Sequence, residues 1–149
     1  MKNGIVASTP TSSLWLRAGA VLGAVAAALA VCVIAHVVGG IPLEVRLTPN
    51  GPVQQVGVPS IVVICLLAGL AAVLLVVALE RVTRHPRRVW AVIAIVMLLL
   101  SLLGPLGAAA TAQAGISLLC MHLAAGAVLI PVLFLSIPVP AERGSAAMT

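Results

Sequence analysis

The feature that most constrains this chain is a series of four apolar segments, at residues 18–38, 61–79, 89–106 and 116–137. Each approaches the roughly 20 residues that a helix needs to cross about 30 Å of hydrocarbon. None of them contains Asp, Glu, Lys or Arg. Lipid offers no hydrogen-bond partner to backbone amides, and the segments lack the period-two alternation of a membrane β-barrel. We therefore predict an all-α, polytopic membrane protein, a bundle of four transmembrane helices that run up and down in turn.

The composition also indicates a lipid environment. Of the 149 residues, 62% are hydrophobic and 7% are charged, whereas soluble domains average about 25% charged residues. A chain of this length leaves much of its surface exposed, so a water-soluble globule could not hide so many apolar side chains. We predict a single membrane domain over residues 1–149, and we do not interpret the net charge of +5 as a nucleic-acid-binding surface.

The basic residues predict the orientation. One side of the predicted bundle has a single basic residue, Arg46. The other side has seven, namely Lys2, Arg17, Arg81, Arg84, Arg87, Arg88 and Arg143. Loops rich in Lys and Arg stay in the cytoplasm, so we predict a multi-pass plasma-membrane protein with both termini cytoplasmic. Trp15 and Trp90 fall at the same ends, and we expect both indole rings in the headgroup layer.

Four of these arginines crowd the short link between the second and third segments. They are Arg81, Arg84, Arg87 and Arg88. Their plain role is to set the topology. Basic residues at this depth also attract anionic lipid headgroups, by about 1 kcal/mol each. We predict such headgroup contacts here, with a specific phospholipid pocket as the sharper alternative.

The loop at residues 39–60 is the main polar region on the predicted outer side. Apolar and polar residues alternate from Leu43 to Leu47, and the "PNG" at residues 49–51 suits a tight turn. Pro52 weakens the return strand because it donates no backbone hydrogen bond. We predict a small β-hairpin that caps the bundle, with a lid or a docking site as the alternative role.

His122 lies inside the fourth segment, about 9 Å from its start at 1.5 Å per residue. Ala125 and Gly126 share its helical stripe, and small residues let a neighbouring helix come close, so we expect His122 to face inward. Burial disfavours the imidazolium, so we expect a neutral ring. We predict a hydrogen bond across the bundle to Ser101. Polar groups inside membranes are also functional candidates, so a ligand-binding role stays open.

His36 and Cys32 lie one turn apart on one face of the predicted first helix. Two inward histidines, His36 and His122, would suit a haem or a metal. However, the chain has no CxxCH, no paired-histidine motif and no second carboxylate nearby. We predict no cofactor, with haem or metal as an open alternative. Cys32, Cys65 and Cys120 all lie in apolar runs, so we interpret them as small buried apolar side chains.

Gly19 and Gly23 form a GxxxG motif that Ala27 extends. A smooth helix face of this kind lets another helix pack closely. We predict a packing surface there, either within the bundle or between copies of the chain.

Several chemical groups that the sequence lacks limit the functions that we predict. The spans hold no carboxylate, which a proton- or cation-coupled transporter normally needs. No CxxC is present for thiol–disulfide exchange, and no acid orients a base beside Ser101, Ser117 or Cys120 for nucleophilic catalysis. We therefore predict a non-enzymatic integral membrane protein that acts as a partner subunit or modulator. It would contact the bilayer, another membrane protein or itself, and no nucleic acid. A binder or carrier of a lipid or quinone and a haem- or metal-containing redox protein are the alternatives.

Three stretches, taken in order, resemble a known family. They are "GPVQQVGVPSIVVICLLAGLAAVLL", "RRVWAVIAIVMLLLSLLGPLGAAAT" and "MHLAAGAVLIPVL". Together they resemble a family of small four-helix actinobacterial membrane proteins of unknown function, over residues 15–137. The resemblance implies the same layout of four spans. It implies no activity, so it assigns no role to any residue.

Overall fold

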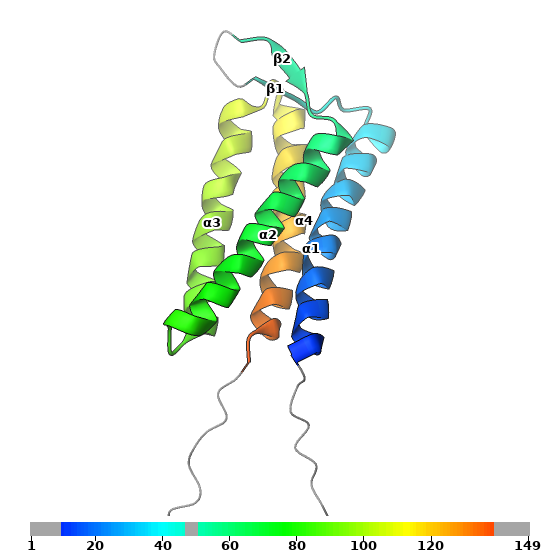
Figure 1. The fold of residues 1–149 in the computed structure, drawn as a ribbon. Helices are drawn as coiled ribbons and strands as arrows, with labels where there is room; N and C mark the ends of the chain where they lie inside the picture. The colour runs from blue at the N-terminus through cyan, green and yellow to red at the C-terminus, as the bar shows by residue number, and fades with distance from the viewer. Residues whose placement is uncertain (1–9, 47–50, 139–149) are drawn as a thin grey trace, which may run out of the picture.

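The computed structural model describes residues 10–46 and 51–138, which form four long helices and a two-stranded hairpin (Figure 1). The elements are α1 (Pro10–Val33), the π-helical turn η1 (Ile34–Val38), β1 (Glu44–Arg46), β2 (Val53–Gln55), α2 (Val58–Val82), α3 (Pro86–Ala108) and α4 (Ala112–Ser136). All four long helices are apolar enough to cross a membrane. The predicted all-α class, with four spans and a hairpin, is confirmed.

The helices are longer than the apolar segments that predict them. Helix α1 starts at Pro10 rather than near residue 18, because proline suits the first helical turn and polar residues can extend a helix beyond its apolar part. Helix α4 starts at Ala112 rather than near residue 116, because the Thr111 hydroxyl accepts a hydrogen bond from the Ala114 N–H at 3.2 Å. Hydropathy indicates the apolar part of a helix, whereas the capping residues determine where the helix begins and ends.

The bundle has two ends of different character (Figure 1). At the end that we call the terminal end, α1 begins, α4 ends and residues 83–85 join α2 to α3. At the opposite end, the hairpin end, the two strands lie over the helices. Helices α1 and α4 pack along each other most extensively. Helices α2 and α3 are close at the terminal end and spread apart toward the hairpin end (Figure 1).

Two apolar clusters hold the helices together, one near each end. The cluster at the terminal end comprises Ala20, Val76, Leu79, Trp90, Ala94, Leu133 and Ile137. The cluster at the hairpin end comprises Ala28, Cys32, Leu43, Ile61, Leu118 and Met121. Between them, α1 and α2 touch at Gly69, where an added Cβ would lie 2.7 Å from Val21 Cγ1.

The hairpin is antiparallel and is tied to the bundle. Glu44 pairs with Gln55 and Arg46 with Val53, while the predicted turn at residues 49–51 lies partly outside the described residues. The Ala110 N–H donates to the Glu44 carbonyl at 3.0 Å, so β1 is joined to the connection between α3 and α4. The structure thus confirms a hairpin and places it over one end of the bundle.

The turn η1 changes which way the last residues of the first helix face. Its i→i+5 bond, from the Gly39 N–H to the Ile34 carbonyl, measures 3.2 Å. Cys32 is buried, but His36 is exposed. The prediction that both residues share an inward face was therefore wrong, because the wider turn no longer keeps the α-helical spacing on which that prediction depended.

Candidate functional site

A cavity of about 560 Å³ lies among the four helices. Its lining along α2 runs from Ile61 to Leu75, which corresponds to about 21 Å at 1.5 Å per residue. The lining is mostly apolar and includes Ala24, Ala28, Cys65, Ala68, Ala72, Trp90, Ala94, Met97, Leu98, Ser101, Met121, His122, Ala125, Gly126 and Leu129. The cavity is therefore long relative to its volume and follows the helix axes.

Small side chains make room for this cavity. Helix α2 contributes Ala68, Ala71 and Ala72 to its wall, and α4 contributes Ala125 and Gly126. These side chains cannot reach across the widening space between α2 and α3. Of the packing glycines predicted from the sequence, Gly126 approaches Leu98 so closely that an added Cβ would lie 2.9 Å from its Cδ1. The small residues beside His122 thus serve both for helix contact and for the cavity.

Two polar side chains of the lining, Ser101 and His122, interact with backbone carbonyls of their own helices. The His122 Nδ1 lies 2.8 Å from the Leu118 carbonyl oxygen, and the Ser101 hydroxyl donates to the Leu98 carbonyl at 2.7 Å. The predicted hydrogen bond between His122 and Ser101 was therefore wrong. A carbonyl one turn back on the same helix is always within reach, whereas a partner on another helix must be brought close.

Ser101 and His122 nevertheless lie at the same level of the bundle. Helices α3 and α4 are antiparallel, and Leu98 meets Gly126. Ser101 lies about one turn from Leu98 and His122 about one turn from Gly126, both toward the hairpin end. The structure thus brings the two predicted residues to one cavity at one depth, without joining them.

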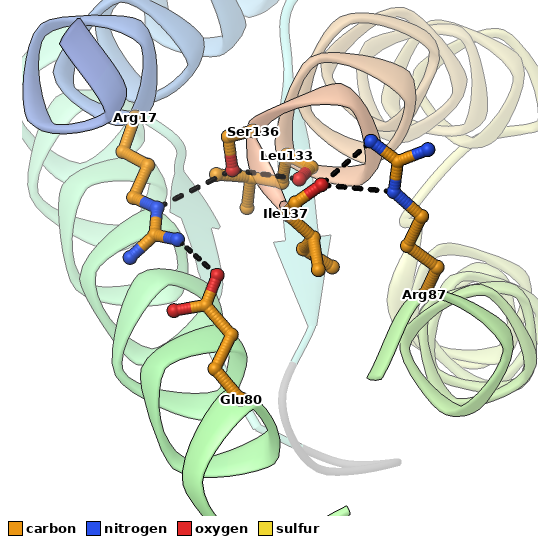
Figure 2. A network of polar contacts seen from close by, with 6 residues as sticks. All are labelled: Arg17, Glu80, Arg87, Leu133, Ser136 and Ile137. Carbon is orange, nitrogen blue, oxygen red and sulfur yellow. Dashed lines mark hydrogen bonds and ion pairs between the residues drawn. The ribbon is translucent and has the colours of Figure 1, made fainter. Parts of the chain in front are cut away.

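A second polar site, which the sequence analysis missed, lies at the terminal end (Figure 2). Arg17, only 6% exposed, forms an ion pair with Glu80, and its Nε donates to the Ser136 hydroxyl at 3.3 Å. The Ser136 hydroxyl donates in turn to the Leu133 carbonyl at 2.7 Å. Arg17 was expected to precede the first helix. It lies inside α1 instead, and this network joins α1, α2 and α4.

Arg87 binds the end of α4 from the other side (Figure 2). Its Nε and Nη2 donate to the Ile137 carbonyl at 2.9 and 2.6 Å, and its guanidinium carbon lies 5.4 Å from the centre of the Phe134 ring. The predicted headgroup residues Arg81, Arg84 and Arg88 are exposed, and none forms an ion pair or hydrogen bond with the described part of the chain. Of the four arginines predicted to contact headgroups, the three exposed ones therefore remain available to a lipid headgroup.

Trp90 corrects another prediction. Its side chain is 3% exposed, and its Nε1 donates to the Ile130 carbonyl at 3.3 Å, so the ring packs between helices rather than in the headgroup layer. Trp15 is exposed on α1. A tryptophan near the end of an apolar segment suits either place, and the facing helix decides between them.

The remaining candidates do not form a site together. Gly23 packs against Val128, whereas nothing lies within 4 Å of where a Cβ of Gly19 would be. All three cysteines are free, but Cys120 is exposed on α4 and was wrongly expected to be buried. Within residues 10–46 and 51–138 there is no group of three His, Cys, Asp or Glu side chains placed to hold a metal ion.

The missed ion pair had a signal in the sequence. Arg17 and Glu80 are adjacent to predicted spans at the same end of the bundle, and Glu80 is the single acidic residue near that end within the described residues. An arginine and a glutamate at one depth on neighbouring helices favour pairing in an apolar environment. The cavity had no such signal in the sequence, because it depends on which faces of the four helices meet.

Comparison with known proteins places the chain in a family without assigning it an activity. No curated protein and no solved structure matches it significantly. A family model described as "Family of unknown function (DUF6069)" matches residues 9–137. That range contains all four long helices completely, and it nearly coincides with residues 15–137, over which the sequence resembles a family of unknown function. Because the match covers most of its length, the chain belongs to this family of unknown function, DUF6069.

Proposed function

We propose that this multi-pass membrane protein is a non-enzymatic binder of an apolar molecule, a lipid or a quinone, which it holds inside the bundle. The observation that carries the proposal is the cavity among the four helices. Its volume of about 560 Å³ lies within the roughly 300–1,000 Å³ that ligand pockets usually have. An apolar wall with a few polar groups is the usual composition of such pockets.

The cavity can be reached from the side of the bundle. Ile64 and Ala68 of α2 and Met97 of α3 line the cavity, yet all three side chains are exposed on the outer surface. They belong to α2 and α3, the two helices that spread apart toward the hairpin end (Figure 1). In a bilayer this opening faces the acyl chains, so a lipid-soluble molecule would enter without crossing water.

Filling the cavity tests the proposal. We expect Ala68→Phe to abolish retention of a co-purifying apolar molecule, because the new ring would occupy the opening. Ala78→Phe, on the same helix, is a matched control because Ala78 is exposed and does not line the cavity. Native mass spectrometry of protein released gently from detergent measures the retained molecule.

The wild type and Ala78→Phe should retain the same adduct, and Ala68→Phe should lose at least about 90% of it. Equal retention by all three proteins would contradict binding in this cavity. An absorption spectrum of the same preparation tests the haem alternative predicted from the sequence, since a bound haem gives a strong Soret band.

A partner-subunit or modulator role is the second candidate. Gly19 is exposed and has open space beside it, so its half of the GxxxG motif is not used within the bundle. A partner helix packing there would be lost on Gly19→Leu but kept on Gly104→Leu, another glycine with open space beside it. Co-purification of a defined membrane protein with the wild type and the control, but not with Gly19→Leu, would support this role.

A further inference from the structure

We infer that the molecule held in the cavity is a long-chain alcohol, whose hydroxyl group donates a hydrogen bond at the level of Ser101 and His122. This inference rests on the proposed function and narrows its ligand class.

His122 offers an acceptor. The Leu118 carbonyl, 2.8 Å from Nδ1, can only accept, so Nδ1 carries the proton and donates. A neutral imidazole protonated at Nδ1 has a lone pair at Nε2. Moving the proton to Nε2 would place the Nδ1 lone pair against the carbonyl oxygen. Because Nδ1 faces the helix backbone, Nε2 is the nitrogen available to a molecule in the cavity.

Ser101 also offers an acceptor. Its single hydroxyl proton is donated to the Leu98 carbonyl at 2.7 Å, which leaves the lone pairs of Oγ. To donate to a ligand, Ser101 would have to break this bond. The indole N–H of Trp90 is likewise engaged, with the Ile130 carbonyl. Among the described residues that line the cavity, the wall therefore has acceptors at the level of Ser101 and His122 and no strong donor free.

Free acceptors without a free donor favour some classes of ligand over others. A ligand hydroxyl can donate to Nε2 of His122 or to Oγ of Ser101. A ketone, an ester or an oxidised quinone has only acceptors, and burying them beside other acceptors without a donor is unfavourable. The class includes prenols, mono- and diacylglycerols and, with a phenolic O–H, hydroquinones, which all share a free hydroxyl group on an apolar body.

The cavity also provides room for the chain. From Ser101 its lining continues along α3 to Trp90, a distance of about 16 Å at 1.5 Å per residue. Leu129, Ala94 and Leu75 line this part, and it is apolar. The hydroxyl would thus lie in the half nearer the hairpin end, with the chain directed toward the terminal end.

The test compares probes that differ only in the donor. Wild-type protein in detergent is incubated with 1-hexadecanol or with its methyl ether, which keeps the oxygen acceptor and loses the O–H. Adducts are quantified by native mass spectrometry. One hydrogen bond corresponds to a preference of about three- to tenfold for the alcohol.

Variants of His122 and Ser101 test whether these two side chains cause the preference for the alcohol over the ether. His122→Leu and Ser101→Ala should each lower the alcohol-to-ether ratio, and the double variant should bring it to about one. His36→Leu and Ser117→Ala are the controls. His36 is exposed, and Ser117 makes the same kind of bond to its own helix, to the Gln113 carbonyl at 3.0 Å, but neither lines the cavity. Both controls should keep the wild-type ratio.

The outcomes separate this inference from the proposed function. Equal retention of both probes, or a preference for the ether, overturns the alcohol class and leaves the cavity as a binding site. Retention of neither probe by the wild type, with no adduct lost on Ala68→Phe, overturns both. Lipid analysis of the co-purified molecule distinguishes a prenol, a hydroquinone and an acylglycerol as sources, and a ligand without a hydroxyl overturns the inference.

Discussion

Arg17 illustrates how one residue can connect three helices. Its guanidinium reaches Glu80 on α2 and Ser136 on α4, and its side chain is almost fully enclosed. A buried charge of this kind is stable only while its counter-charge is present, since an isolated ion in an apolar environment is very costly. The ion pair therefore affects stability mainly because the loss of one partner would leave a buried charge unpaired. The attraction between the two charges contributes less.

Removing the negative partner should destabilise the protein. Glu80→Gln leaves the Arg17 charge buried, and we expect a loss of about 2–4 kcal/mol, toward the lower end of measured values because Glu80 is partly exposed. Arg81→Gln, at the next position, is the control because Arg81 is exposed and unpaired in the described part of the chain. Thermal unfolding in detergent, followed by circular dichroism, measures both.

The double variant sharpens this prediction. Arg17→Leu combined with Glu80→Leu removes both charges, so it should be less destabilised than Glu80→Gln alone. If Glu80→Gln unfolds at the temperature of the wild type, the ion pair does not stabilise the bundle.

At the scale of the elements, two of the closest helix contacts form at glycines, which have no side chain to keep the neighbouring helix away. Gly69 brings α2 against Val21 of α1, and Gly126 brings α4 against Leu98 of α3. Helix α2 also has small side chains, Ala68 and Ala72, where it lines the cavity, and these leave the cavity open there. One helix thus packs tightly on α1 and loosely on α3.

Gly69→Ala should be destabilising, although alanine is the better helix former. Its Cβ would lie 2.7 Å from Val21 Cγ1, so the Val21 side chain or one of the two helices must shift, at a cost of about 1–3 kcal/mol. Gly104→Ala, with open space beside it, should be neutral or stabilising by up to about 1 kcal/mol. Chemical or thermal unfolding compares the two. Adding Val21→Ala to Gly69→Ala should restore part of the loss, and no rescue would locate the strain elsewhere.

The elements were predictable from the sequence to different degrees. The four spans and the hairpin follow from apolar length and from the "PNG" turn, because both are local properties. The start of α1 and the place of Arg17 were wrong, because hydropathy alone cannot distinguish a flanking arginine from one buried by a partner 63 residues away. His122 was placed correctly in the bundle, but its partner was not, because its own backbone offers a nearer acceptor.

For the whole molecule, the two ends are held in different ways. Polar contacts of Arg17 and Arg87 join the helices at the terminal end, and backbone bonds from β1 join the hairpin to the α3–α4 connection at the other end. Helix α2 packs less extensively on α3 than on α1 and diverges from α3 toward the hairpin end (Figure 1). The opening of the cavity therefore lies between two helices that pack loosely on each other.

The orientation of the whole molecule is still a prediction. Seven basic residues on the terminal side against Arg46 on the hairpin side favour a cytoplasmic terminal end. A fluorescent protein that folds only in the cytoplasm, fused after Thr149, should fluoresce. The same reporter inserted after Gly51, between the strands, should stay dark, and the reverse pattern would contradict the predicted topology.

The separation of Arg17 from Glu80 has a consequence for biogenesis. The two residues are 63 positions apart, so when α1 emerges from the ribosome the carboxylate that will pair with Arg17 has not been synthesised. During that interval the guanidinium is an unpaired cation, which is retained at the aqueous face and resists translocation. It becomes enclosed only when α2 and α4 have joined α1. We therefore expect this one arginine to act first on how the nascent chain is inserted into the membrane and later on how the helices of the finished bundle are held together.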